Sequence, residues 1–86
     1  MKILIDTSGM VDLVLPGGLN ARHPGRLVVS EVKGWRSAEV ILTEEPRCTV
    51  GDSVTVSLGP YSAEATVIRM SAYGAVLKVN GAVDGL

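Results

Sequence analysis

The segment GDSVTVSLGPYSAEATVIRM, residues 51–70, predicts two β-strands joined by a tight turn. In its first half, valine or leucine at every second position alternates with serine and threonine, as in a strand with one face in the core and one in water. Gly59-Pro60 supplies the turn, because proline fixes φ and glycine tolerates positive φ. Residues 61–70 are apolar on both faces towards their end, so we expect both faces of that strand to be covered there.

Composition indicates how the rest of the chain completes this hairpin, which would be only marginally stable alone. The 86 residues suffice for one domain, residues 1–86, with a single modest core. Apolar residues make up 47% of the chain but phenylalanine is absent, so the core must consist of valine, leucine, isoleucine and alanine. Because β-branched residues favour strands and glycine and proline supply turns, we expect an all-β domain.

Turn signals divide the remaining sequence into short strands. The turns are expected at Thr7-Ser8-Gly9, Pro16-Gly17-Gly18, Lys33-Gly34 and Asn80-Gly81. The strands between them are expected at residues 2–6, 10–15, 27–32, 35–43 and 74–79. Residues 19–26 are expected to form an exposed loop, and residues 82–86 a frayed tail. The predicted fold is a small six- or seven-stranded, mostly antiparallel β-barrel built from successive hairpins.

Two further observations bear on this architecture. Residues 37–45 have helical as well as strand spacing, so a short helix is an alternative there. The segment GWRSAE, residues 34–39, is echoed by GPYSAE, residues 59–64, and Gly9 lies 25 residues before Gly34. A hairpin that recurs at this interval favours the barrel, in which successive hairpins close the sheet edges.

Charge and hydropathy exclude several classes of protein. A net charge of −1 argues against a protein that binds a nucleic-acid backbone, and the three aromatic residues make a poor platform for stacking bases. No apolar run approaches the roughly 20 residues of a membrane-spanning helix. The single cysteine, Cys48, cannot form an internal disulfide and is expected to be a small hydrophobic residue at a strand edge. We expect a cytoplasmic protein.

The residues that could support catalysis are few. His23 is the only histidine, and in its Pro-Gly context a surface position is the simpler expectation. No serine or cysteine lies in a motif that would activate it as a nucleophile, and no phosphate-binding loop or metal-ligand spacing occurs. We therefore expect neither an enzyme nor a cofactor.

The best candidates for binding are Arg22 and Arg26, with Asn20 and His23 beside them. Two guanidinium groups on a glycine-containing loop can each offer a planar fork to phosphate oxygens or to a guanine edge. The alternative is that both are solvated loop charges. Trp35 and Arg36 are candidates for contact with a protein partner at a turn, although a lone tryptophan can also pack over the rim of a barrel.

Several of these residues resemble the PilZ family. The similarity lies in Arg22-His23-Pro24-Gly25-Arg26 and in the segments VGDSVTV, ATVIR and YGAVLKV, residues 50–56, 65–69 and 73–79. PilZ domains are bacterial six-stranded barrels that bind cyclic di-GMP through an RxxxR loop and a D/N-x-S-x-x-G motif. The resemblance implies a ligand-binding role for Arg22 and Arg26; the second motif has no counterpart around residues 29–38. PilZ domains without the ligand act through protein contacts.

A second resemblance is to the TOBE/Mop barrels, which bind oxyanions. It rests on Ala21-Arg22-His23 and on residues 25–29 and 38–42. The leading hypothesis is a non-enzymatic, PilZ-like regulatory module that binds cyclic di-GMP or a protein partner. The alternative is a structural or assembly subunit, of a ring, a phage particle or a secretion complex, that self-associates through edge strands.

Overall fold

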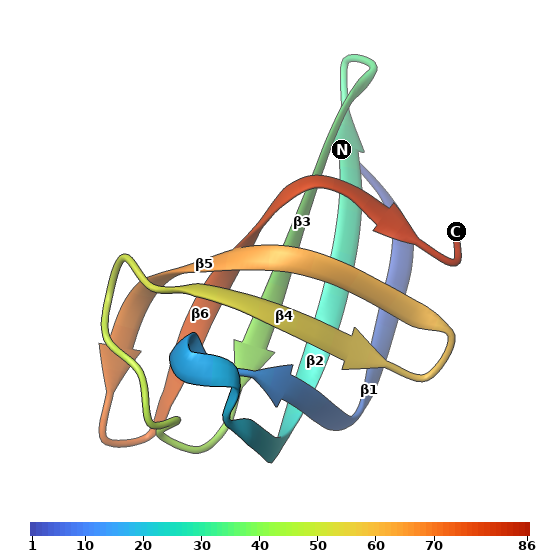
Figure 1. The fold of residues 1–86 in the computed structure, drawn as a ribbon. Coiled ribbons are helices and arrows are strands. Elements are labelled where there is room, and N and C mark those ends of the chain that lie inside the picture. Colours follow the sequence, from blue (N-terminus) through green and yellow to red (C-terminus); the bar gives the residue numbers. More distant parts are fainter.

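The computed structural model describes residues 1–86 as a closed, six-stranded antiparallel β-barrel, which confirms the predicted fold class (Figure 1). The order around the barrel is β1-β2-β3-β6-β5-β4, and β4 closes against β1. The strands are β1 (Lys2–Val14), β2 (Asn20–Val32), β3 (Trp35–Leu42), β4 (Ser53–Leu58), β5 (Tyr61–Ser71) and β6 (Gly74–Asp84). A short 3₁₀ turn, η1 (Pro16–Gly18), joins β1 to β2.

The barrel interior contains only aliphatic side chains, as the composition requires. Every strand contributes alternate residues to it, so the period of two predicted from the sequence is the period of burial. The buried residues are Val11, Leu13, Leu15, Leu27, Val29, Ala38, Val40, Leu42, Val54, Val56, Leu58, Ala63, Ala65, Val67, Ala75, Leu77, Val79 and Val83. No polar or charged side chain is buried, so this interior supports the fold and holds no reactive group.

The hairpin of β4 and β5 confirms the prediction made from residues 51–70. Val54, Val56 and Leu58 point into the core, and the chain turns at Gly59-Pro60. The expectation that the end of β5 is covered on both faces is wrong. Ile68 is the unpaired residue of an irregularity between Val67 and Arg69, and it is 46% exposed.

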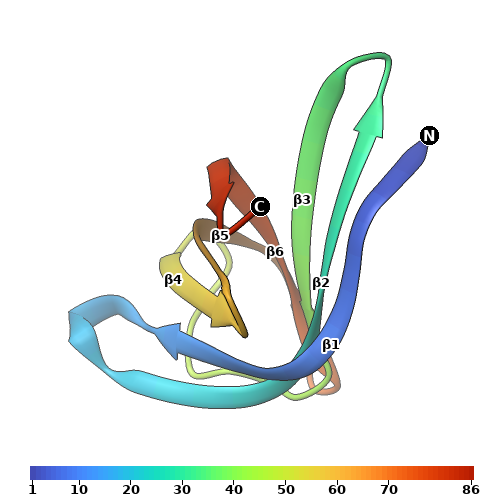
Figure 2. The same cartoon turned by 90° about the vertical axis from the view of Figure 1, so that its right-hand side faces the viewer.

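The turn predicted at Thr7-Ser8-Gly9 is wrong, because β1 continues through these residues. They pair with Leu27, Arg26 and Gly25 of β2 in an unbroken register. The two strands bend together as they leave the sheet to curl around the barrel (Figure 2). Gly9 and Gly25 lie opposite each other in this ribbon, and a pair without side chains at one level allows close approach and a tight bend.

The exposed loop predicted at residues 19–26 is also wrong, since nearly all of it belongs to β2. Its turn-forming residues are held extended by β1, which pairs with β2 from Asn20 onwards. Pro24 is tolerated because the pairing of β2 with β3 begins only at Gly25, so at Pro24 one side of the strand has no strand neighbour.

The turn at Lys33-Gly34 is confirmed, and β3 follows it as a strand rather than as the alternative helix. Both residues have positive φ, 51° and 81°. A two-residue hairpin turn needs these angles to match the twist of its strands.

The turn predicted at Asn80-Gly81 is wrong. β6 continues to Asp84, and Gly81 takes its positive φ of 76° inside an irregular stretch of the strand.

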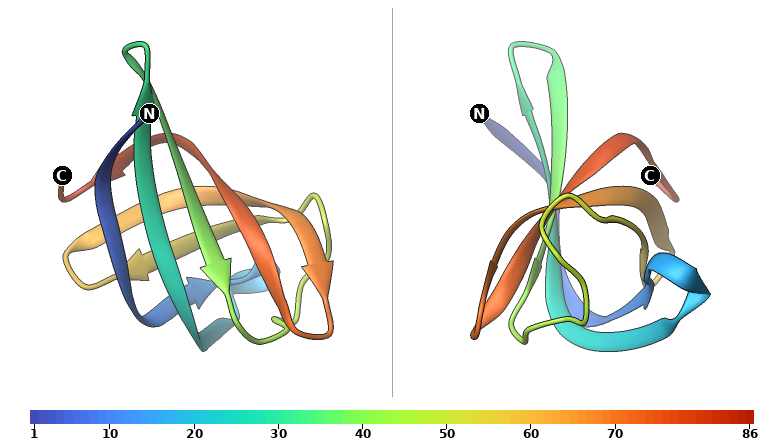
Figure 3. Two further views of the ribbon diagram at one scale, coloured as in Figure 1. Left: turned by 180° about the vertical axis from the view of Figure 1, so that it is seen from behind. Right: turned by 60° about the vertical axis from the view of Figure 1, so that its left-hand side comes forward.

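One part of the sheet projects beyond the closed barrel. β1 pairs with β4 only through residues 12–14, and β3 pairs with β6 only through residues 39–42. Beyond these pairings β1, β2 and β3 continue together as a three-stranded extension (Figures 1 and 3). We call this extension, residues 2–6, 28–32 and 35–38, the arm.

Candidate functional site

The residues expected to bind a ligand all lie on the first half of β2. Asn20, Arg22 and Arg26 are exposed, whereas His23 alternates with them and lies on the inward side of the strand. Because they belong to a strand paired along its length with β1, they cannot fold over a ligand as a flexible loop would.

Each of the two arginines has a carboxylate partner on β1. Arg22 Nε lies 3.2 Å from Asp12 Oδ1, the residue directly opposite it. Arg26 donates two hydrogen bonds of 2.6 Å to Asp6, one from Nε and one from Nη2. These hydrogen bonds lower the pKa of the Asp6 carboxyl from its ordinary value of 3.8. An anionic ligand that bound either guanidinium group would have to displace its aspartate partner or share the guanidinium with it.

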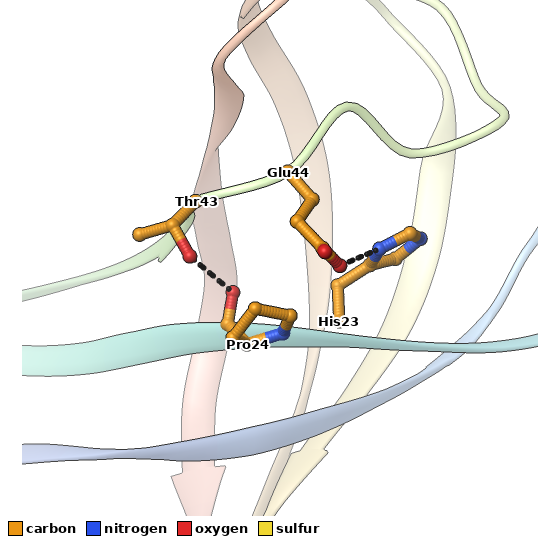
Figure 4. Close-up of polar contacts among 4 residues, drawn as sticks. All are labelled: His23, Pro24, Thr43 and Glu44. Carbon is orange, nitrogen blue, oxygen red and sulfur yellow. Dashed lines mark hydrogen bonds and ion pairs between the residues drawn. The ribbon is translucent and has the colours of Figure 1, made fainter.

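His23 connects β2 to the loop of residues 43–52. Its Nδ1 lies 3.0 Å from Glu44 Oε1, and the adjacent Pro24 carbonyl accepts hydrogen bonds from the backbone N–H and the hydroxyl of Thr43 (Figure 4). The His23 side chain is only 18% exposed, which is less than expected for a surface histidine. These contacts hold the start of the loop against β2.

A groove of about 360 Å³ opens beside these contacts. Its lining residues are Leu15, Leu19, Asn20, Ala21, Arg22, His23, Glu45 and Arg47. Three of the four residues expected to bind a ligand therefore share one concave surface, from which Arg26 is absent. Arg47 is not among the candidates named from the sequence, because it belongs to none of the motifs found there. No local signal could show that the loop of residues 43–52 returns to β2.

The two residues expected to contact a partner, Trp35 and Arg36, lie at the tip of the arm. Trp35 is 82% exposed and does not pack over the barrel rim. It pairs across the hairpin with Val32, which is also exposed. Arg36 pairs with Glu31, with 3.6 Å between Arg36 Nε and Glu31 Oε2.

Other reactive groups are sparse. No three histidine, cysteine, aspartate or glutamate side chains come together in a way that could hold a metal ion. Cys48 is a free, partly buried thiol in the loop of residues 43–52, and burial raises its pKa, with the Asp52 carboxylate acting in the same direction. The structure has no helix long and apolar enough to cross a bilayer.

Comparisons with known proteins leave the family open. Neither the protein-family models, nor the curated proteins, nor the solved structures contain a match to this chain. The resemblances to PilZ and TOBE/Mop barrels therefore rest on the quoted residues alone.

Proposed function

We propose that this protein is a non-enzymatic assembly subunit that associates with further copies of itself through the arm. The observation that carries this proposal is the combination of an open edge of β1, which runs from the barrel into the arm, and exposed apolar side chains on the arm. A strand edge offers unpaired N–H and C=O groups to another chain, and natural proteins usually shield such edges.

The open edge belongs to β1. Because β4 covers only residues 12–14 of that strand, residues 2–11 have a strand neighbour on the β2 side alone. An irregularity between Ile3 and Ile5 interrupts the first residues of this edge, whereas residues 6–11 keep a regular register with β2. The regular part can pair with a strand of another molecule.

The apolar side chains lie on the outer face of the arm. Directly opposed residues of antiparallel strands share a face, which places Ile3 with Ser30 and Val32 with Trp35. Ile3 is 48% exposed, Val32 47% and Trp35 82%. Exposed apolar side chains that gather on one face of a small protein favour a site of association there.

The experiment is size-exclusion chromatography with light scattering over a range of concentrations. We expect masses that are multiples of the 9.0 kDa chain and that increase with concentration. The Trp35→Ser variant should shift the equilibrium towards monomer. The matched control is Tyr73→Ser, which removes another exposed aromatic side chain from the β5–β6 turn, outside the arm. A clean monomer at high concentration, or an equal loss with Tyr73→Ser, would contradict the proposal.

A second candidate function is anion binding in the groove beside η1. The observation that favours it is the presence of Arg22 and Arg47 on one concave surface with Asn20 and His23. The PilZ resemblance suggests cyclic di-GMP as the ligand. Its two phosphates could bind the guanidinium groups of Arg22 and Arg47 if the contact between Asp12 and Arg22 were broken.

Calorimetric titration with cyclic di-GMP, with GTP as the control nucleotide, tests this candidate. We expect saturable binding, and each of the Arg22→Ala and Arg47→Ala variants should cost roughly 1.5–3 kcal/mol of binding free energy, the value of a charge-assisted hydrogen bond. The Arg26→Ala variant distinguishes two binding sites for the nucleotide. Unchanged affinity would indicate that the ligand binds in the groove, and lost affinity would indicate that it binds between Arg22 and Arg26. The absence of heat with wild-type protein would rule out this ligand.

A further inference from the structure

The free edge of β1 forms the outer border of the arm, where no other strand of the chain pairs with it (Figure 2). Its outward side chains can be identified from the pairing with β2, because directly opposed residues share a face. Alternate residues 30, 28, 26 and 24 of β2 lie on the outer face. From the tip of the arm towards the barrel, their partners on β1 are Ile3, Asp6, Ser8 and Met10. Leu4 is the extra residue of the irregularity between Ile3 and Ile5 and does not alter this order.

These four side chains form a pattern that reads alike in both directions. Ile3 and Met10, at its ends, are apolar and 48% and 45% exposed. Asp6 and Ser8, between them, are polar and exposed. A second copy of the strand that runs antiparallel to the first can therefore place an apolar side chain opposite an apolar one, and a hydroxyl opposite a carboxylate.

Few registers are open to such a pair. Two copies of β1 related by a two-fold axis oppose residues symmetrically about a central residue. Because β4 occupies the edge from Asp12 onwards, residues 6–9 are the centres in the regular part that leave at least two pairs on each side. A centre at Asp6 or Gly9 is destabilising, because Asp6 then faces a second Asp6 or Asp12. A centre at Ser8 places the Asp6 carboxylate opposite the apolar side chain of Met10.

A centre at Thr7 matches the pattern. Asp6 then lies opposite Ser8 of the other copy, and Ile3 lies opposite Met10. The Asp6 carboxylate already accepts two hydrogen bonds within its own chain, and it keeps acceptor sites for the serine hydroxyl. The two Thr7 side chains meet on the other face of the sheet, as a favourable cross-strand pair.

We propose that two copies of this protein pair through the free edges of β1, antiparallel and centred on Thr7, so that their arms form one continuous sheet. This inference rests on the proposed self-association and names its partner strand and its register. The contact is isologous and uses each edge once, so it closes as a dimer of two 9.0 kDa chains. The other free edge of the arm, residues 35–38 of β3, is shorter, and its pairing with β1 would leave one edge of each kind open.

The exposed apolar residues Val32 and Trp35 lie on β2 and β3, away from this junction. They remain exposed in the dimer and are free to join one dimer to another. Trp35→Ser therefore tests the contact through the outer face, and variants of β1 test the contact through the edge.

Disulfide cross-linking tests the register. Cys48, the only cysteine, is first replaced by alanine, and Thr7→Cys and Ser8→Cys are then compared under mild oxidation. Thr7→Cys should give a disulfide-linked dimer, because directly opposed residues have Cβ atoms roughly 4.5–5.5 Å apart. Ser8→Cys should stay reduced, because the two copies of residue 8 would be diagonal neighbours about 7–8 Å apart, beyond the reach of a disulfide. Ser8 is more exposed than Thr7, so random collisions would give the opposite result.

Light scattering over a range of concentrations tests the apolar pair. Met10→Ser should weaken the dimer about fivefold, because each dimer contains two pairs of Ile3 with Met10. Val14→Ser is the matched control. Val14 lies on the same face of β1 and is 43% exposed, but it belongs to the part of the strand that β4 covers.

The outcomes separate this inference from the function on which it rests. A wild-type monomer at every concentration would contradict self-association itself. An oligomer in which Thr7→Cys stays reduced, or in which Ser8→Cys cross-links instead, would overturn the proposed register and leave self-association through the arm standing. Equal weakening by Met10→Ser and Val14→Ser would also overturn it. Unchanged melting temperatures of the reduced variants would show that they remain folded.

Discussion

The arm continues three of the six strands of the closed barrel, yet apolar side chains are buried inside the barrel and exposed on the outer face of the arm. Within the barrel, one face of β2 packs on the other strands, and Leu27 is buried. In the arm, Val32 lies on the opposite, outer face of β2 together with Trp35, and it remains exposed because no element of the chain packs on that face. The comparison shows that apolar residues on a strand indicate a surface to be covered, and neighbouring elements determine whether the chain covers it itself.

The largest expected effect contrasts a core residue with an arm residue. Leu77→Ala should lower the free energy of unfolding by about 2–5 kcal/mol, because Leu77 is fully buried and its loss leaves a cavity. Ile3→Ala, in the arm, should stay within about 0.5 kcal/mol, as for a surface position. Urea denaturation of the monomer measures both. A large cost for Ile3→Ala would mean that the arm is part of the folding core.

The next effect concerns the bent ribbon between the two regions. A Cβ at Gly25 would lie 2.8 Å from the Ile41 carbonyl oxygen and 2.9 Å from Val11 Cγ2, so Gly25→Ala should cost about 1–3 kcal/mol. Gly9→Ala is the matched control, because the new methyl would meet only the flexible end of Leu58, at 3.1 Å. Thermal unfolding compares the two variants. Equal costs would indicate that the bend, and not the local packing at Gly25, requires glycine.

The smallest effect tests the ion pair that joins the arm to the barrel. The lowered pKa of Asp6 means that its carboxylate stabilises the folded state above about pH 4, and that this contribution disappears as the pH falls through the lowered pKa. Asp6→Asn should therefore be slightly less stable than wild type at neutral pH, and the difference should disappear once the pH falls below the lowered pKa of Asp6. Asp84→Asn, a substitution at an exposed site on β6, is the control and should follow the wild-type curve. Parallel curves for Asp6→Asn would mean that the pair contributes nothing.

Turn-forming residues predicted the structure correctly where the two strands that flank them pair with each other. Gly59-Pro60 and Lys33-Gly34 form turns as predicted, because each lies between strands that pair directly with one another. Thr7-Ser8-Gly9 and Asn80-Gly81 have equally strong turn chemistry but lie inside strands. At these positions the pairing of β1 with β2 and of β6 with β5 outweighs local preference, and the sequence carries no sign of that pairing.

The residues of the candidate sites could be named from the sequence, but most of their contacts could not. Trp35 and Arg36 were singled out from the sequence, and both lie on the projecting arm. The carboxylate partners of Arg22 and Arg26, and the approach of Arg47 to the groove, depend on strand register and on the return of a loop. Contacts between residues ten or more positions apart are not visible in the local patterns of a single sequence.

The alternation of apolar and polar residues and the absence of phenylalanine were sufficient to predict a small β-barrel, its aliphatic core and the buried face of the strand at residues 53–58. Both follow from short-range physical chemistry: side chains alternate along a strand, and apolar surface leaves water. The lengths of β1 and β2, the projection of the arm and its two free edges depend on how far each strand pairs with its neighbours. Strand pairing is a long-range property, because its hydrogen bonds join backbone groups that are chemically alike in every residue except proline.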